Sequence, residues 1–199
     1  MLELLTGTGL AAAAGLNAYV PLIVLGLGSR LLDFVQLPSG WAWLGNEWVL
    51  IILGVLLVIE FVADKIPVVD SINDWVQTVV RPVAGGIVFG GGSSTETAFV
   101  TDPDKFFSSN QWVPIVVGIV IALAIHLVKS AARPVINTVT AGFGGAAVST
   151  AEDAGAIGLS LSALLLPLFV IVMLAIVVVG FIALFRRLGR AGKAVTARE

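Results

Sequence analysis

The chain has 199 residues, of which 58% are hydrophobic and only 12% are charged, and its mean hydropathy is +1.04. A soluble domain carries about a quarter charged residues, so this composition excludes an ordinary soluble domain and predicts an integral membrane protein. The chain has no cysteine, which excludes disulfides and thiolate ligands, and its single histidine, His126, excludes a multi-histidine metal site. A net charge of −2 argues against a nucleic-acid role, and no cofactor is expected.

Four apolar segments are long enough to cross a bilayer as helices: about 8–29, 48–63, 112–128 and 157–185. Only helices and closed barrels satisfy their backbone hydrogen bonds in lipid, and no segment alternates with the period of two that a barrel strand needs. We therefore expect an all-α polytopic membrane protein. It would have about four transmembrane helices plus segments that are broken by Gly and Pro, re-entrant or amphipathic.

The first apolar segment lacks the basic flank of a secretory signal peptide, so we expect it to remain as a span. Small residues form one stripe along it: Gly7, Ala11, Gly15 and Ala18. Such a stripe lets a neighbouring helix approach closely, which favours a packing face over a ligand site. Asn17 and Pro21 interrupt the segment, and a buried asparagine needs a hydrogen-bond partner.

The connector at 66–111 contains "DSINDWVQTVV", whose apolar residues share one helical face. Ser71 and Asp74 have the spacing of a capping box, which predicts that a short amphipathic helix begins there. Asp70 and Asp74 also form a D-x-x-x-D pair, a spacing that some membrane transferases use to hold Mg²⁺. The wet face of an interfacial helix explains the same carboxylates, so a metal site there is a weak hypothesis.

The last apolar segment is too long for one crossing, since Thr150 to Phe185 would make a helix of about 54 Å. Pro167 offers a place to bend, and Glu152 and Asp153 are expected to cap this helix at its start. The residues at 186–199 hold five of the eleven basic residues, so the C-terminus is predicted to be cytoplasmic. An even number of spans would place the N-terminus on the same side.

Two segments resemble each other, "WVLIILGVLLVIEFVADK" (48–65) and "WVPIVVGIVIALAIHLVK" (112–129). Trp, Val, Ile, Gly and Lys match at a constant offset, and each segment leads to an Arg-Pro-Val, at 81–83 and at 133–135. Duplication and ordinary membrane composition both explain the match. If the connector does not cross the bilayer, the two spans are antiparallel, which would be the inverted repeat of many secondary transporters.

This interpretation gives a single membrane domain at 1–185, with possible half-repeats at 1–92 and 93–185, followed by the basic tail at 186–199. Gly- and Pro-interrupted segments in corresponding halves point to a binding site between them.

Ionisable residues inside apolar segments are costly unless they face a partner or a cavity, so they are candidates for a site. The hypothesis is a substrate- or ion-binding site made of Asn17, Glu60, Asp64, Arg81, His126 and Arg133. Alternatives remain for three of them. Glu60 could be a structural lock bonded to Asn17 or Tyr19, Asp64 could extend to the membrane interface as Lys65 is expected to do, and His126 could be a satisfied core histidine. In an antiparallel arrangement Glu60 would lie level with Val120 and would not reach His126.

Several stretches together resemble an uncharacterised bacterial membrane family, the domain of unknown function DUF4126. They are "GLAAAAGLNAYVPLIVLGL", "EFVADKIPVVDSINDWVQTVVRPVAGG", "HLVKSAARPVINT" and "AEDAGAIGL", which lie between about 9 and 160, whereas 161–199 adds nothing to the resemblance. The resemblance implies a multi-pass protein of the bacterial cytoplasmic membrane. It implies no activity, so no catalytic residue is carried over.

The leading functional hypothesis is a small transporter or channel with a polar site between the two repeats. In it Glu60 is the carboxylate that couples to a proton or cation, and Arg81 and Arg133 can hold an anionic group. The rival is a non-catalytic accessory subunit of a larger membrane complex, and the third is a lipid-active enzyme that uses Asp70 and Asp74. The expected partners are the lipid bilayer and a second copy of the chain or a larger complex.

Overall fold

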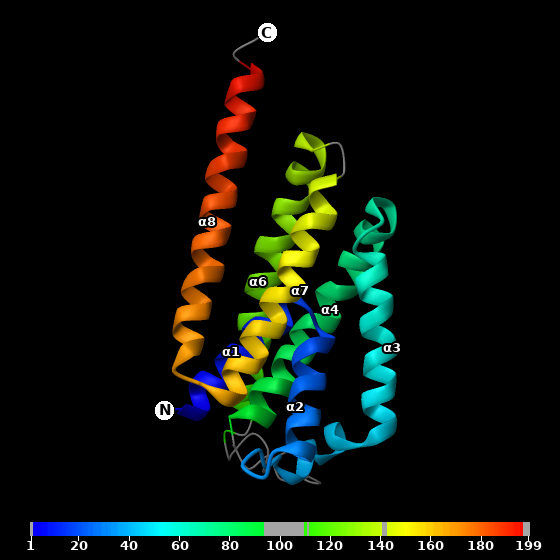
Figure 1. Ribbon diagram of the computed structural model, residues 1–199, viewed down its shortest axis with the longest axis vertical. Helices are drawn as coiled ribbons and strands as arrows, with labels where there is room; N and C mark the ends of the chain where they lie inside the picture. The colour runs from blue at the N-terminus through cyan, green and yellow to red at the C-terminus, as the bar shows by residue number, and fades with distance from the viewer. Residues whose placement is uncertain (1, 94–109, 111, 141–142, 197–199) are drawn as a thin grey trace.

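The computed structural model describes residues 2–93, 110, 112–140 and 143–196 (Figure 1). All regular structure in this part of the chain is helical, which confirms the all-α prediction. The helices are α1 (Leu2–Leu16), α2 (Tyr19–Leu31), the 3₁₀ helix η1 (Ser39–Gly45), α3 (Glu47–Ala63), α4 (Pro67–Gly92), α6 (Trp112–Val139), α7 (Phe143–Leu165) and α8 (Phe169–Thr196).

The first apolar segment is a helical hairpin, not one span. In Figure 1, α1 rises from the lower end of the bundle and α2 returns to it. The side-chain oxygen of Asn17 accepts hydrogen bonds from the backbone N–H groups of Tyr19 and Val20, at 3.1 Å each. These bonds cap the start of α2, and Pro21 fits the first turn because no intrahelical donor is needed there. The chain therefore reverses in the middle of the bundle.

The centre of the bundle is α1, which contacts α4, α6 and α7. The predicted packing residues lie on this hairpin and are buried: Gly7, Ala11, Gly15 and Ala18. A Cβ atom at Gly15 would lie 2.7 Å from the carbonyl oxygen of Ala122 on α6. One on Gly7 would lie 3.2 Å from the ring of Phe89 on α4. Small side chains thus allow the central helix to be enclosed by its neighbours.

The connector after α3 contains a long helix, which corrects the sequence-based prediction. Helix α4 begins at Pro67, four residues before Ser71, because proline fits the first position of a helix. It then continues through Pro82 to Gly92, and α6 likewise continues through Pro134. The Arg-Pro-Val sequences are therefore not chain breaks.

The repeated segments run in the same direction, so the inverted repeat is wrong. Both α3 and α6 rise from the lower end in Figure 1, because α4 carries the chain back between them. The two Arg-Pro-Val sequences also lie on helices that do not correspond. The first is on α4, the helix that follows the one with Trp48, whereas the second is on α6, the same helix as Trp112. The half-repeats at 1–92 and 93–185 have no support in this arrangement.

The last apolar segment forms two helices that reverse around Pro167. Helix α7 descends and α8 rises in Figure 1, so α1 begins at the lower end and α8 finishes at the upper end. This arrangement does not favour the expectation that the two ends of the chain face the same side of a membrane. Helix α7 also begins at Phe143, so Glu152 and Asp153 lie in its interior instead of capping it.

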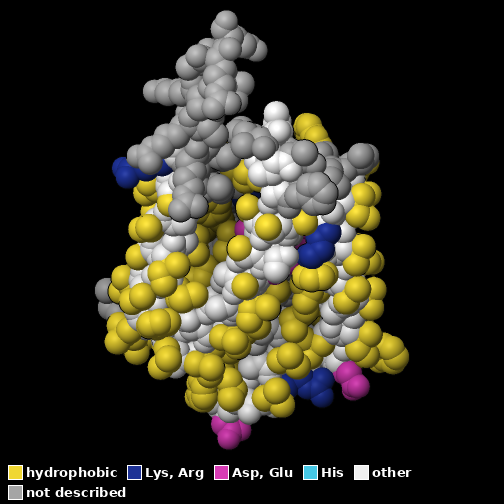
Figure 2. Space-filling view, turned by 45° about the horizontal axis from the view of Figure 1, so that its top comes forward, with side chains coloured by type: hydrophobic (Ala, Val, Ile, Leu, Met, Phe, Trp, Pro, Cys, Tyr) yellow, Lys and Arg dark blue, Asp and Glu magenta, His cyan; other side chains and the backbone are white. Residues whose placement is uncertain are grey.

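Hydrophobic side chains cover much of the outer surface. Figure 2 shows them across the middle of one face, with charged side chains near its lower edge and its upper part. On α3, for example, Val55, Val58 and Ile59 are each more than half exposed. One helical stretch among the described residues, Trp112–Pro134, is long and apolar enough by itself to cross a membrane, and the bent pair of η1 and α3 would make a second.

A buried ion-pair cluster as the candidate functional site

The interior of the bundle holds a cluster of charged side chains, which we call the ion-pair cluster. Six of its members have residue exposures of 7% or less: Glu60, Asp64, Arg81, Lys129, Arg133 and Glu152. They come from α3 and its C-cap and from α4, α6 and α7. Charges so far from water require partners, because an isolated buried charge costs several kcal/mol (order of magnitude).

Asp64 is the centre of the cluster. Its Oδ2 lies 3.1 Å from Arg133 Nη2, 3.5 Å from Lys129 Nζ and 3.9 Å from Arg81 Nη2. Asn73 donates a hydrogen bond of 2.8 Å to its other oxygen. The position follows from the end of α3, where Asp64 is the C-cap and the chain turns toward α4. One carboxylate thereby connects α3, α4 and α6.

Glu152 joins α7 to the same cations. Its Oε2 lies 2.9 Å from Lys129 Nζ and 3.2 Å from Arg133 Nη2. Lys129 and Arg133 are one turn apart on α6, so both can face the same pair of carboxylates. The two acidic and two basic groups therefore form one network across three elements.

Glu60 has a different environment, in which Arg81 is its partner. Arg81 Nη2 donates a hydrogen bond of 2.8 Å to Glu60 Oε1. Arg81 Nη1 lies 3.3 Å from the carbonyl oxygen of Gly15 and 3.4 Å from Nδ1 of His126. Arginine can only donate, so Nδ1 of His126 accepts, and this assigns the hydrogen to Nε2. Nε2 lies 3.0 Å from the hydroxyl oxygen of Thr78, which can accept this hydrogen. Because one ring nitrogen accepts a hydrogen bond and the other donates one, these contacts fit a neutral imidazole.

The tip of the α1–α2 hairpin ends against this cluster. The last carbonyl groups of α1 accept hydrogen bonds from cations, Gly15 from Arg81 and Leu16 from Lys129 at 3.1 Å. The carboxyl end of a helix carries partial negative charge, so cations are favoured there. Asn17 donates a 3.0 Å hydrogen bond to Asp153 on α7. The hairpin tip is thus part of the polar site.

All six residues of the predicted site come together here. Glu60, Asp64, Arg81, His126 and Arg133 are joined by direct contacts, and Asn17 is linked at the hairpin tip. Glu60 pairs with Arg81 instead of Asn17 or Tyr19, and it approaches His126 through that arginine. The antiparallel assumption had placed it level with Val120, which the parallel α3 and α6 overturn.

Three members were missed or misassigned from the sequence. Lys129 lies between His126 and Arg133 at helical spacing, a signal that was present but was not used for the site. Glu152 and Asp153 were interpreted as helix caps, because nothing local shows that their helix begins at Phe143. Once α7 is known, Glu152 lies about one turn after Ser149, whose hydroxyl is 3.4 Å from Asp64, so both side chains face the cluster.

The weak metal hypothesis gains no support. The side chain of Asp70 lies outside the described residues, and Asp74 is half-buried on α4. No group of three or more His, Asp or Glu residues in the described part of the chain is placed to hold a metal ion.

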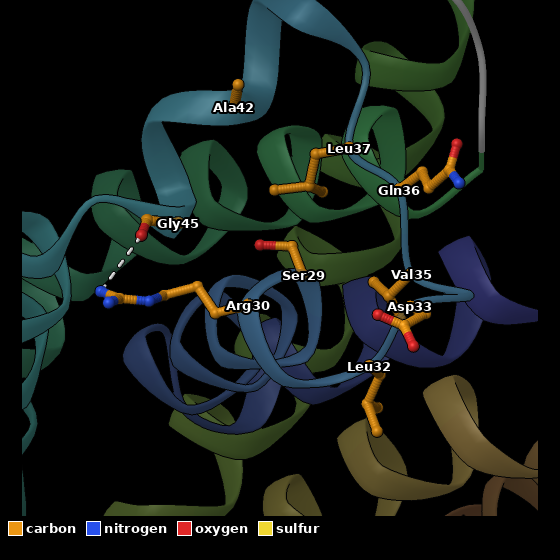
Figure 3. A pocket seen from close by; sticks show the side chains of 9 residues that line it. All are labelled: Ser29, Arg30, Leu32, Asp33, Val35, Gln36, Leu37, Ala42 and Gly45. Atoms are coloured by element: carbon orange, nitrogen blue, oxygen red, sulfur yellow. Dashed lines mark hydrogen bonds between the residues drawn. The ribbon is translucent and has the colours of Figure 1, made fainter.

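A separate cavity of about 460 Å³ lies at the lower end of the bundle, and Figure 3 shows its lining. Its walls come from the end of α2, the following loop and η1, and include the polar residues Ser29, Arg30, Asp33 and Gln36. The guanidinium of Arg30 lies 3.5 Å from the carbonyl oxygen of Gly45. None of the predicted site residues lines this cavity.

Fold and site together define a helical bundle that is hydrophobic outside and encloses an ion-pair cluster. The chain belongs to the family described as a domain of unknown function, DUF4126, which matches residues 4–187 and confirms the resemblance noted in the sequence. The match extends beyond residue 160, whereas the stretches that carry the resemblance in the sequence end there. No curated protein and no solved structure matches the chain.

Proposed function

We propose that the protein is a multi-pass membrane protein and that the ion-pair cluster is the polar site of a small transporter or channel. The observation that carries the proposal is the inverted distribution of polarity, with charges buried at the hairpin tip and apolar side chains outside. In a water-soluble protein the apolar side chains would be inside, whereas in lipid an apolar surface costs nothing.

The surface supports a bilayer environment. Trp48 is 73% exposed at the start of α3, and Trp43 is also exposed on η1, both at the lower end of the bundle. Trp75 is 81% exposed in the first half of α4, a helix that begins at the opposite end of the bundle. Tryptophan is enriched at both membrane interfaces, so these side chains would mark the two edges of the hydrocarbon layer.

The hairpin supports a transport role. Helices α1 and α2 have 15 and 13 residues, so each is about 20 Å long and shorter than the hydrocarbon layer of about 30 Å. Helices that end inside the membrane expose backbone groups there, and transporters use such ends to bind ions and charged groups. The carbonyl end of α1 already binds Arg81 and Lys129, so a movement of either cation would alter the site.

This proposal carries an orientation. The basic tail predicts a cytoplasmic C-terminus in the bacterial inner membrane. Since α1 begins and α8 ends at opposite ends of the bundle, the N-terminal end then faces outward.

Flux measurements on purified protein in liposomes test the proposal. We expect protein-dependent flux in a panel of protons, sodium, potassium and chloride, and we expect Glu60→Gln to abolish it while the protein keeps its fold. Glu47→Gln is the matched control, because Glu47 is exposed at the start of α3 and should leave flux unchanged. Flux of all four ions no greater than in protein-free liposomes would contradict the proposal.

The second candidate is an accessory subunit in which the cluster is a structural lock. The observation that favours it is the number of direct ion pairs that join α3, α4, α6 and α7. In that case Glu60→Gln should lower the unfolding temperature, and the protein should be recovered from native membranes with a larger complex. Recovery as a monomer or homodimer would argue against this candidate.

A further inference from the structure

We propose that the ion-pair cluster binds one exchangeable proton on Glu60, and that Arg81 turns from Glu60 toward Asp64 when this proton is bound. The inference deepens the proposed transport function by naming the coupling ion, and for its physiological role it rests on that function. The proton site itself rests on the geometry of the cluster.

The first argument is the balance of charge. The acidic groups that α3, α4 and α7 direct to the cluster and its rim are Glu60, Asp64, Asp74, Glu152 and Asp153. The basic groups from the α3–α4 turn, α4 and α6 are Lys65, Arg81, Lys129 and Arg133. The other titratable groups that face it are the neutral His126 on α6 and Tyr19 on α2. Acidic groups exceed basic groups by one among the described residues, so one bound proton would make the cluster neutral.

The second argument identifies Glu60 as the acceptor. Among the three buried carboxylates, Asp64 has three cationic groups within 4 Å and Glu152 has two, whereas Glu60 has one among the described residues, Arg81. Glu60 Oε2 is buried and receives no hydrogen bond from any described group. A carboxylate oxygen buried in this way is costly when it is charged and becomes a donor when it is protonated.

The third argument is a matching acceptor nearby. Gln77 is 1% exposed, and its Oε1 is likewise buried without a donor from the described groups. Gln77 precedes Arg81, the partner of Glu60, by one turn of α4. Gln77 also forms a side-chain hydrogen bond with Tyr19, and Glu60 is close enough to that phenol for their charges to interact. A hydroxyl on Glu60 would bring a donor to this acceptor-rich side of the cluster. Asp74 and Asp153 each also have one buried oxygen that receives no hydrogen bond from a described group. Their side chains are partly exposed, whereas Glu60 is 1% exposed, so burial opposes a charge on Glu60 more than on these two.

The step conserves charge and atoms. A hydronium ion gives its proton to Oε2 and becomes water, so an O–H bond of hydronium breaks as the O–H bond on Glu60 forms. The carboxylate becomes a neutral acid, and its ion pair with Arg81 is lost. The other carboxylate within 4 Å of Arg81 is Asp64, at 3.9 Å. Because Arg81 also holds the Gly15 carbonyl at the end of α1, its displacement transmits the protonation to the hairpin.

Infrared spectroscopy of the purified full chain in lipid discs tests this site, because a protonated carboxyl group has a C=O stretching band that a carboxylate lacks. The exposed carboxylates also give such bands on acidification, so the site is tested by the difference between the variants. We expect one band component that appears on acidification in the wild type and is absent in Glu60→Gln. Asp74→Asn is the matched control and should retain the band. A wild type without such a band, a band that survives in Glu60→Gln, or one that is lost in Asp74→Asn would overturn the assignment. A band that responds to sodium at constant pH would overturn it too.

A second variant protects the test against loss of folding in Glu60→Gln. Gln77→Leu removes the proposed acceptor without removing an ion pair, so the band should remain but move in frequency. A band that does not move would overturn the assignment.

The proton site and the transport function can be tested separately. If Glu60 is protonated on acidification but the protein shows no flux, the proton site is supported and the transport function is contradicted. If the protein shows flux but no Glu60 band, the transport function is supported and the proton site is contradicted.

Discussion

At the scale of single residues, the ion-pair cluster shows why charges can persist in an apolar chain. Each carboxylate at its core lies within 3.2 Å of a basic group, as with Asp64 and Arg133 at 3.1 Å. The attraction between such groups is strong in a medium of low dielectric constant, although their desolvation offsets much of it. Removing one partner is therefore much more costly than the net value of the pair.

The first prediction concerns Asp64, the group with the most cationic neighbours in the described network. Asp64→Asn keeps the shape of the side chain but leaves three buried cations facing a neutral amide. We expect a loss of about 3–5 kcal/mol in the free energy of unfolding, the range for breaking a buried ion pair. Thermal or denaturant unfolding in detergent measures it.

Asp33→Asn is the control for this prediction, because Asp33 is an exposed carboxylate at the lower end of the bundle. It should change the free energy of unfolding by less than about 0.5 kcal/mol. Equal losses for the two variants would show that the cluster does not contribute to stability in the way described.

At the scale of elements, close approach between helices depends on glycine. Helices α4 and α6 have the most extensive contact of any pair in the described chain. At their crossing, Gly118 faces the backbone carbonyl of Gly85, and a Cβ atom on Gly118 would overlap that oxygen. This approach positions Arg81 on α4 beside His126 on α6, so packing and the polar site depend on the same crossing.

The second prediction tests this crossing. We expect Gly118→Ala to lower the free energy of unfolding by about 1–3 kcal/mol, because the backbones of α4 and α6 must separate. It should also weaken the contact between Arg81 and His126, which reduces any flux. Unfolding and flux measurements on the same preparation check both effects.

Gly54→Ala is the matched control, since Gly54 lies on α3 and a Cβ atom there would meet nothing within 4 Å. Alanine favours a helix over glycine by up to about 1 kcal/mol, so this variant should be neutral or stabilising. Destabilisation of the protein by both variants to the same extent would contradict the assigned contact.

At the scale of the whole molecule, the path of the chain determines which faces the ends occupy. The α1–α2 hairpin returns to its starting side, and the five longer helices that follow alternate in direction (Figure 1). Helix α8 therefore finishes at the end of the bundle opposite to the start of α1. In the proposed membrane arrangement the two ends of the chain would lie on opposite sides, and the basic tail would be the end that faces the cytoplasm.

The third prediction is that the two ends of the chain lie on opposite sides of the membrane. The sequence has no cysteine, so single cysteines can be introduced at Glu3 and at Arg186 without a background signal. In intact cells a membrane-impermeant thiol reagent should label the Glu3→Cys variant and not the Arg186→Cys variant. Labelling of both, or of neither until the cells are opened, would contradict the arrangement of helices.

The sequence by itself determined the helical class, the family and the identity of most charged members of the site. These follow from local or compositional signals. Long apolar runs indicate helices, and a distinctive block around Glu60 and Asp64 indicates the family. Ionisable residues within apolar segments indicate the site, because charged side chains that face lipid are too costly. The sequence also indicated that Asn17 needs a partner, since a buried amide must form hydrogen bonds.

Only the tertiary structure decided which charges meet. The apolar pattern around Pro82 and Pro134 suggested breaks, yet packing between α4 and α6 keeps both helices continuous, while Asn17 and Pro167 reverse the chain. These choices depend on contacts between residues far apart in sequence, such as Asn17 with Asp153 at 3.0 Å. Glu60 and Arg81 pair because α4 crosses back beside α3, and the physical reason is that a buried charge takes whichever partner the path of the chain brings within reach.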